Sequence, residues 1–346
     1  MYYIKKLQRQ EMGSPDSSGR THRGRYIYLS KDSGDFFPQM SKVVENDTLI
    51  LPIVMPHKET KMYAKFVYHN SKYSVLNPVE RPRNEFRLYL NNDIDNNKEF
   101  FRVDDIVVLE KVDVSSIYAD TNELPCVYSI SIFNIESEEY VHLDKILSES
   151  NMRGEHAIYE EKLEFIKTPS TEILDRAEIS DEIIDVVDKQ QKELIETLSN
   201  NDDDVETIED IRGANLFNSV SFRDFVMMAY NYKCAITGKS ISYQSLINLE
   251  AAHIQPKAHA GTFLPCNGLA LSRDMHWAFD KGFFTISDDY TVVVHEKVKS
   301  TLLSEYDGKS IMIPRDDYFK PEKKFLKHHR ENVFGLFINS GGIRAM

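Results

Sequence analysis

Cysteine and long apolar runs are scarce in this chain of 346 residues. Its three cysteines, Cys126, Cys234 and Cys266, are odd in number and widely spaced, so they form neither a disulfide framework nor a CxxC pair. That pattern favours a reducing, cytoplasmic compartment. No run of 18 or more apolar residues is present, so no transmembrane helix is expected. The N-terminal stretch MYYIKKLQRQEMGS lacks the apolar region of a secretory signal, and none is predicted.

Positive charge is also in short supply, since the formal net charge is −13. The distribution matters more than the total. Residues 1–112 carry a net charge of +3, residues 113–211 carry −20, and residues 212–346 carry +4. An acidic middle therefore separates two mildly basic ends, and phosphate binding at either end is not excluded.

The first third of the chain has the pattern of a β-rich domain. Short runs of alternating or β-branched residues are separated by turn residues such as Gly34, Pro56 and Asn77. Strands are expected at Arg25–Leu29, Thr48–Met55, Tyr63–Tyr68, Phe86–Leu90, Ile106–Lys111 and Val127–Phe133. Several short strands without a helical pattern indicate a small barrel or sandwich, so residues 1–165 are predicted to form a β-barrel-like domain.

Two basic clusters lie within this predicted domain, one in a Gly/Ser-rich loop near the N-terminus and one in the segment RPRNEFR. Arginine beside Asn, His and Tyr is the chemistry that contacts phosphates and base edges. The alternative is that these are solvated charges in loops. The candidate DNA-binding residues are Arg20, Arg23, Arg25, Arg81, Arg83, Asn84 and Arg87.

An acidic helical segment follows at residues 166–211. Ser180–Leu198 has apolar residues at helical spacing, with Ser180 as the expected N-cap, and Asn200–Asp204 is a polar break. The segment is predicted to be a helical connector. A dimer-contact helix and a spacer with no specific role are the alternatives.

The last third contains an unusual concentration of polar residues. After an amphipathic helix at Ser221–Tyr232, with Ser221 as its cap, the pattern predicts strand, turn, strand and helix. These elements are Leu246–Ile254, Asn267–Gly268, Leu269–Leu271 and Ser272–Phe279, with Gly282 as the C-terminal stop. On the helix, His276 and Asp280 are four residues apart and share a face, which suits two ligands of a divalent metal. His253, at the end of the first strand, is available as a base.

Residues Lys233–Phe284 resemble the HNH nuclease family, which has a ββα-metal fold. The resemblance lies in AAHIQP, NGLAL and the nine-residue spacing from Asn267 to His276, with Asp280 four residues later. The motifs C-x-x-T-G, LEAAHI and HxxFD resemble bacterial restriction-type and defence nucleases. Residues 212–346 are therefore expected to be an HNH nuclease domain.

This resemblance implies roles for individual residues. His253 would be the general base, and Asn267 would tie the metal loop together and help to orient His253. His276 and Asp280 would hold one divalent ion, Mg²⁺ first and Mn²⁺ or a similar ion second.

The position before the general base, a third ligand in many members of the family, is Ala252 in this chain. Glu250 lies on the same side of the strand and is the candidate third ligand, directly or through water. Cys234 and Cys266 lack partner cysteines, so no structural zinc is expected.

The N-terminal segments GSPDSSGRTHRGRYIYLS and RPRNEFRLYLNN resemble the DNA-binding pseudobarrel of restriction enzymes and plant transcription factors. That resemblance implies two arginine-bearing loops that grip the major groove. The alternative is a domain that senses modified DNA, with a pocket for a flipped base or an altered phosphate.

The chain is thus predicted to be an α+β multidomain protein with a β-barrel-like domain, an acidic helical connector and a ββα-metal domain. The expected function is a metal-dependent, restriction-type DNA endonuclease that acts on double-stranded DNA as a homodimer, away from membranes. One alternative is a DNA-binding regulatory protein with an inactive nuclease fold. The other is a defence effector nuclease whose N-terminal domain senses a signal.

Overall fold

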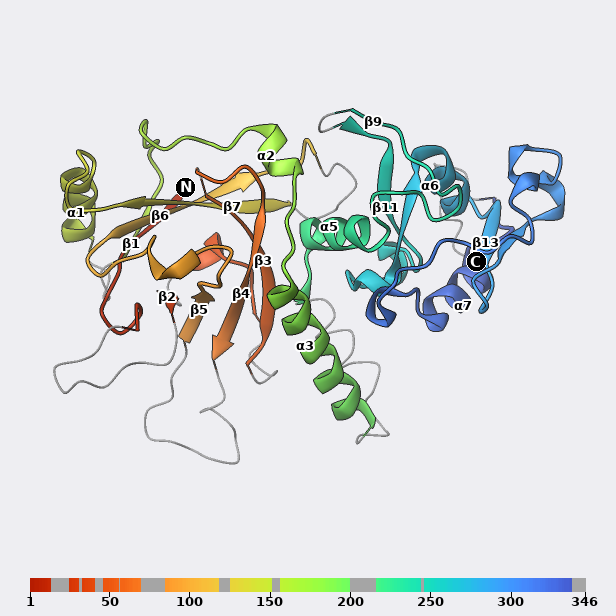
Figure 1. Ribbon diagram of the computed structural model, residues 1–346, viewed down its shortest axis with the longest axis horizontal. Helices are drawn as coiled ribbons and strands as arrows, with labels where there is room; N and C mark the ends of the chain where they lie inside the picture. Colours follow the sequence, from red (N-terminus) through yellow and green to blue (C-terminus); the bar gives the residue numbers. More distant parts are fainter. Residues whose placement is uncertain are drawn as a thin grey trace. The chain divides into compact units, whose positions relative to one another are not determined.

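The computed structural model describes residues 1–13, 25–30, 33–40, 46–55, 57–69, 85–117, 125–150, 156–199, 216–243 and 246–337. The chain divides into two compact units, Met1–Val220 and Ser221–Met346 (Figure 1). The predicted three-part division at 165/166 and 211/212 stays a prediction. Within the described ranges, every helix is too short or too polar to cross a membrane.

The first unit contains a curled eight-stranded sheet in the order β2-β5-β4-β3-β7-β6-β1-β8. The strands are β1 (Tyr2–Lys6), β2 (Tyr26–Leu29), β3 (Thr48–Val54), β4 (Met62–His69), β5 (Glu85–Tyr89), β6 (Ile106–Asp113), β7 (Cys126–Phe133) and β8 (His156–Tyr159). All six predicted strands are confirmed. β1 and β8 were not predicted, because each is short and lacks clear turn residues at both ends. Every neighbouring pair is antiparallel except β3 and β7, which are parallel.

Both faces of this sheet are buried. On β1, Tyr3 belongs to one hydrophobic cluster, while its neighbours Tyr2 and Ile4 belong to another. This alternation follows from the two-residue period of a strand. The second cluster is completed by α1 (Tyr140–Glu149), which covers that face with Leu143 and two further apolar side chains.

The chain then passes through α2 (Thr171–Asp175) and α3 (Asp181–Ser199). The buried ammonium of Lys61, at the start of β4, donates a 2.6 Å hydrogen bond to the Leu174 carbonyl and so fixes α2 to the sheet. The helix predicted at Ser180–Leu198 is confirmed as α3. The polar break at Asn200–Asp204 lies outside the described residues, and the acidic connector as a whole stays a prediction.

The second unit is organised around a two-stranded hairpin and the helix after it. Its elements are α5 (Ser219–Ala229, which starts in the first unit), β9 (Ser242–Tyr243), β10 (Leu246–Ile247), β11 (Leu249–His253), β12 (Gly268–Ser272), α6 (Arg273–Asp280), β13 (Phe284–Ile286), β14 (Val292–Val294) and α7 (Lys323–Asn332). Short 3₁₀ turns lie at Gly34–Phe36, Asn96–Lys98, Lys257–His259, Pro265–Asn267, Glu296–Val298, Leu302–Glu305 and Asp317–Phe319.

Two predicted boundaries in the second unit are wrong. Ser221 lies inside α5 and is not its cap, because the helix begins two residues earlier, where Val220 is buried in an apolar cluster. The strand predicted at Leu246–Ile254 is interrupted at Asn248. The Asn248 side chain accepts a 2.7 Å hydrogen bond from the Ile241 N–H, which bends the chain into the small β9–β10 pair before β11 begins.

The predicted stop at Gly282 ends α6 as expected from the sequence. Gly282 has φ +71°, and the N–H groups of Gly282 and Phe283 donate to the carbonyls of Phe279 and Ala278. This is a Schellman motif, which needs a residue that tolerates positive φ. Ser272 occupies the predicted N-cap position, although its hydroxyl makes no capping bond.

Candidate active site

Four of the side chains predicted from the sequence come from neighbouring elements of the second unit. Glu250 and His253 lie on β11, and His276 and Asp280 lie on α6. α6 begins directly after β12, which pairs antiparallel with β11. The contact between His276 and Glu250 places the helix against β11. The hairpin and helix therefore bring together groups that are up to 30 residues apart in the chain.

His276 stands between two carboxylates. Its Nδ1 lies 2.8 Å from Glu250 Oε2, and its Nε2 lies 3.4 Å from Asp280 Oδ2. The hydrogen bond from His276 is the main reason why the pKa of Glu250 lies below its usual value. Arg273 adds a 3.2 Å ion pair to the other Glu250 oxygen. Glu250 is thus ionised and holds one nitrogen of the imidazole.

His276 and Asp280 fit as two ligands of one small divalent ion. The described residues contain no group of three His, Cys, Asp or Glu side chains that could hold a metal. Neighbouring ligand atoms on an ion with bonds of about 2.1 Å are about 3 Å apart. His276 Nε2 and Asp280 Oδ2 are close to that spacing. Ala252, at the position of the missing third ligand, is fully buried. Two protein ligands with several waters suit Mg²⁺ or Mn²⁺.

His253 has the environment of a base without a partner. Its ring stacks on Phe222, with centroids 4.2 Å apart, and meets Phe263 at 5.6 Å. Its Nε2 is buried and has no hydrogen-bond partner among the described residues. Burial, with smaller effects of Lys257 and His276, lowers the pKa of His253 to about 3. The imidazole is therefore neutral and able to accept a proton.

Asn267 closes the loop that follows His253. Its Oδ1 accepts from the Gln255 N–H at 2.8 Å, and its Nδ2 donates to the carbonyls of Gln255 and Thr262. Its own carbonyl accepts from the N–H of Ile254, the residue after His253. Asn267 is fully buried, and its side chain contacts only backbone. It therefore acts on His253 through the loop.

Phe222 is a residue of the site that the sequence did not indicate as functional. It lies on the apolar face of α5, where its aromatic side chain was interpreted as core. A Cβ added to Gly268 would lie 2.4 Å from Val226 and 3.0 Å from Phe222. This close approach seats α5 against the hairpin and puts Phe222 on the His253 ring. Arg273 was also missed, although its three-residue spacing from His276 is visible in the sequence.

The structure describes only two of the seven predicted DNA-binding residues, Arg25 and Arg87. Arg20, Arg23, Arg81, Arg83 and Asn84 lie outside the described residues. The two that are described make contacts inside the first unit, as follows.

The guanidinium of Arg25 donates to Asp95 Oδ2 and to the carbonyls of Met12 and Phe101. Arg87 pairs with Glu85 and lies 4.3 Å from the Tyr26 ring centroid. Both side chains are thus engaged in stabilising the domain.

Comparison with known proteins identifies part of the second unit. Residues 234–287 match the HNH endonuclease family. A solved structure titled "Modification dependent TagI restriction endonuclease" is 21% identical over 35% of this chain and 39% of that chain, with a TM-score of 0.28. The chain thus matches well under half of that protein's length, and a likeness of this size carries no argument about fold or function. No curated protein matches the chain.

Proposed function

We propose that this nuclease, whose residues 234–287 are an HNH endonuclease domain, hydrolyses phosphodiester bonds of double-stranded DNA with the aid of a divalent metal. The observation that carries the proposal is the unpartnered imidazole of His253, within electrostatic range of His276, which pairs with Asp280. A buried nitrogen without a partner is costly to the fold, and a catalytic role is one reason why such a group is retained.

His253 is the general base in this proposal. A neutral imidazole takes the proton from the attacking water as the water adds to phosphorus. Stacking on Phe222 holds the ring in one plane, and the Asn267 loop holds the strand end that carries it. The depressed pKa keeps the imidazole unprotonated in the free enzyme, and a phosphate anion beside it would favour the protonated form.

His276 and Asp280 hold the divalent ion. When bound, the ion neutralises charge that develops on the phosphate and on the leaving oxygen. Glu250 accepts from Nδ1–H of His276, which leaves Nε2 with a lone pair on the Asp280 side. This geometry favours Glu250 as the group that orients His276. Direct ligation by Glu250 stays a prediction from the sequence.

Double-strand cleavage follows from two copies of this site. A single site of this kind cuts one strand, so we propose that the chain acts on duplex DNA as a homodimer. In this proposal the N-terminal unit recognises the DNA, and the enzyme is of the restriction type.

Plasmid cleavage tests the proposed function. The full chain with Mg²⁺ or Mn²⁺ is expected to nick and linearise plasmid, and chelation of the metal is expected to stop it. His253→Ala should lose at least about 100-fold in cleavage rate, because general base catalysis typically contributes that much. Cleavage by His253→Ala at the wild-type rate would show that His253 is not the base. DNA that is bound but uncut by the wild-type chain would favour an inactive, regulatory nuclease fold.

A further inference from the structure

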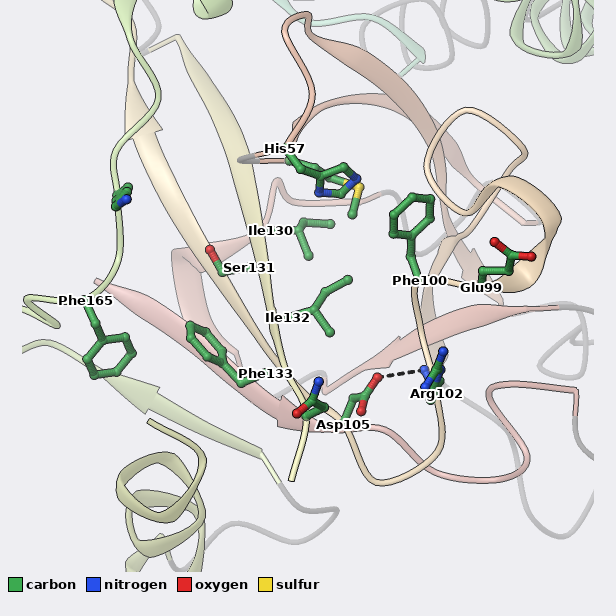
Figure 2. A pocket seen from close by; sticks show the side chains of 13 residues that line it. His57, Glu99, Phe100, Arg102, Asp105, Ile130, Ser131, Ile132, Phe133 and Phe165 are labelled. Carbon is green, nitrogen blue, oxygen red and sulfur yellow. Dashed lines mark hydrogen bonds between the residues drawn. The ribbon is translucent and has the colours of Figure 1, made fainter. Parts of the chain in front are cut away.

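A cavity of about 480 Å³ opens in the first unit, between β7 and the segments that follow β3, precede β6 and follow β8 (Figure 2). Ile130 and Ile132 of β7 form the middle of its floor. Its volume lies within the range of small-molecule binding sites. Nothing in the nuclease chemistry of the second unit uses this cavity.

Aromatic side chains form two sides of the cavity. His57 and Phe100 stack with ring centroids 4.7 Å apart and an angle of 20° between the ring planes. On the other side, Phe133 and Phe165 meet edge to face at 5.5 Å. Phe100 is 37% exposed although it is large and apolar, with one face of its ring stacked on His57 and the Lys58 ammonium 5.8 Å from its centroid. Such walls favour a flat, aromatic ligand.

Asp105 provides a buried acceptor in the cavity. The residue is only 6% exposed, and its Oδ2 accepts a 2.9 Å hydrogen bond from the Arg102 N–H (Figure 2). Its Oδ1 accepts no hydrogen bond within the part of the chain that the structure describes and is not fully buried, so it is accessible to water or to a ligand. Burial raises the pKa of this carboxyl, which reflects the cost of leaving it poorly solvated. A ligand N–H would satisfy it.

Cationic side chains lie at the rim of the same cavity. Arg102 and Lys167 both line it and are exposed. The cavity thus combines flat apolar walls, the Asp105 carboxylate and two exposed cations, and the exposed carboxylate of Glu99 also lines it. An aromatic ring with an N–H donor and an attached anion matches all three.

We propose that this cavity binds a nucleotide unit, with its base between the His57–Phe100 and Phe133–Phe165 pairs and its phosphate near Arg102 and Lys167. Asp105 accepts a hydrogen bond from an exocyclic amino group of the base, as carboxylates do from cytosine N4. The site therefore favours cytosine, adenine and guanine over thymine, which has no exocyclic amino group. The nucleotide comes from a DNA strand, by eversion of a base, or from free nucleotide. The inference deepens the proposed function, and it rests on that function for its role.

The first test is equilibrium binding of dCMP, dAMP, dGMP and dTMP to the full-length His253→Ala chain in chelator. At least one amino-bearing nucleotide is expected to bind at least ten times more tightly than dTMP. Asp105→Asn should weaken that binding tenfold or more, because an amide nitrogen or a neutral oxygen replaces the carboxylate. Asp104→Asn is the matched control, since it removes the same charge from the exposed neighbouring residue and should leave binding unchanged.

Phe100→Ala provides a second variant at an exposed position, in case Asp105→Asn folds poorly. It should also weaken binding tenfold, whereas Ile135→Ala, at an exposed position outside the cavity, should not. The inference is overturned if none of the four nucleotides binds at millimolar concentration and the duplex arm below is also negative. Equal binding by Asp105→Asn and Asp104→Asn would overturn it as well.

The second arm distinguishes the two sources of the nucleotide. Duplex DNA with 2-aminopurine opposite thymine is mixed with the same chains, and reactivity of the unpaired thymine to permanganate reports eversion of its partner base. Reactivity with His253→Ala that is lost on adding Asp105→Asn identifies a nucleotide of the strand. Mononucleotide binding without that reactivity identifies free nucleotide. Both readouts avoid cleavage, so plasmid cutting without any nucleotide binding would refute this inference and leave the nuclease assignment intact.

Discussion

His276 is the residue on which the candidate site depends, because carboxylates approach both of its nitrogens. Glu250 at Nδ1 and Asp280 at Nε2 have different roles in this geometry. A carboxylate on the nitrogen away from a metal fixes the tautomer and the ring orientation. The missing third ligand at Ala252 is therefore compatible with a site in which Glu250 acts through His276.

Variants of Glu250 test this role. Glu250→Ala is expected to weaken Mn²⁺ binding about 10- to 100-fold, measured by titration calorimetry. Glu250→Gln keeps an acceptor for Nδ1–H and should lose much less. Glu331→Gln, at an exposed ion pair on α7, is the control and should bind as the wild type does. Equal losses for the Ala and Gln variants would instead identify Glu250 as a direct ligand, because an amide oxygen is a poorer ligand than a carboxylate.

Removal of the Asn267 side chain should destabilise the second unit. Asn267→Ala leaves the part-buried N–H and carbonyl of Gln255 and the buried carbonyl of Thr262 without their partner, at a cost of about 3 kcal/mol in the free energy of unfolding. Asn332→Ala removes one exposed bond to the His328 carbonyl and should cost under about 0.5 kcal/mol. Urea unfolding measures both. Similar costs for the two variants would show that Asn267 does not tie the loop.

At the scale of elements, α6 owes its position to its two ends. Its N-terminus continues directly from β12, and its C-terminus stops at Gly282. The Gly282 carbonyl accepts from the Gly335 N–H, and a Cβ on Gly282 would lie 2.1 Å from the Val333 carbonyl oxygen. The end of α6 is thus packed against the segment after α7.

Comparing Gly282 with Gly308 distinguishes the cost of backbone strain from the cost of steric overlap. Gly282 and Gly308 have similar φ values of +71° and +76°, but a Cβ on Gly308 meets nothing within 4 Å. Gly308→Ala is expected to cost about 1 kcal/mol from strain alone. Gly282→Ala should cost about 1–3 kcal/mol more from overlap with Val333 and should lower cleavage activity. Equal melting temperatures for the two variants would contradict this packing role.

At the scale of the whole molecule, half-buried His69 and buried His329 make the fold sensitive to acid. Burial is the main cause that lowers the pKa of His69 in the first unit to about 4 and that of His329 in the second unit to about 4. His329 is only 1% exposed and stacks on Phe279. Its Nδ1 lies 2.9 Å from the Thr285 hydroxyl. The folded state therefore keeps this imidazole neutral.

Acid should weaken the fold through His329 in a defined pH window. Below about pH 6.5 the unfolded chain gains a proton at this position, while the folded chain gains it only near pH 4. Stability therefore falls as the pH falls through this interval, by about 2 kcal/mol from His329 between pH 7.5 and pH 5. His329→Phe should be less stable at pH 7.5 but should lose less on acidification. Urea unfolding at both pH values checks this, and an unchanged pH slope would refute it.

Much of the candidate site was predictable from local patterns. His253, Asn267, His276 and Asp280 were proposed from their spacing along a strand, a turn and a helix; the family match covers the same segment, and their roles stay predictions. The six strands and the helix α3 were predictable for the same reason. The period of apolar residues and the turn residues between runs are properties of neighbouring positions, which need no knowledge of the fold.

Other features depended on contacts between distant parts of the chain. The parallel pairing of β3 with β7, the stacking of Phe222 on His253 and the engagement of Arg25 by Asp95 each join residues 30 or more positions apart. The cavity around Asp105 collects loops and strands from residues 55 to 167. A local sequence pattern cannot predict these contacts, because they depend on how whole elements pack. The packing of whole elements also decides whether an arginine is exposed to DNA or makes contacts within the fold.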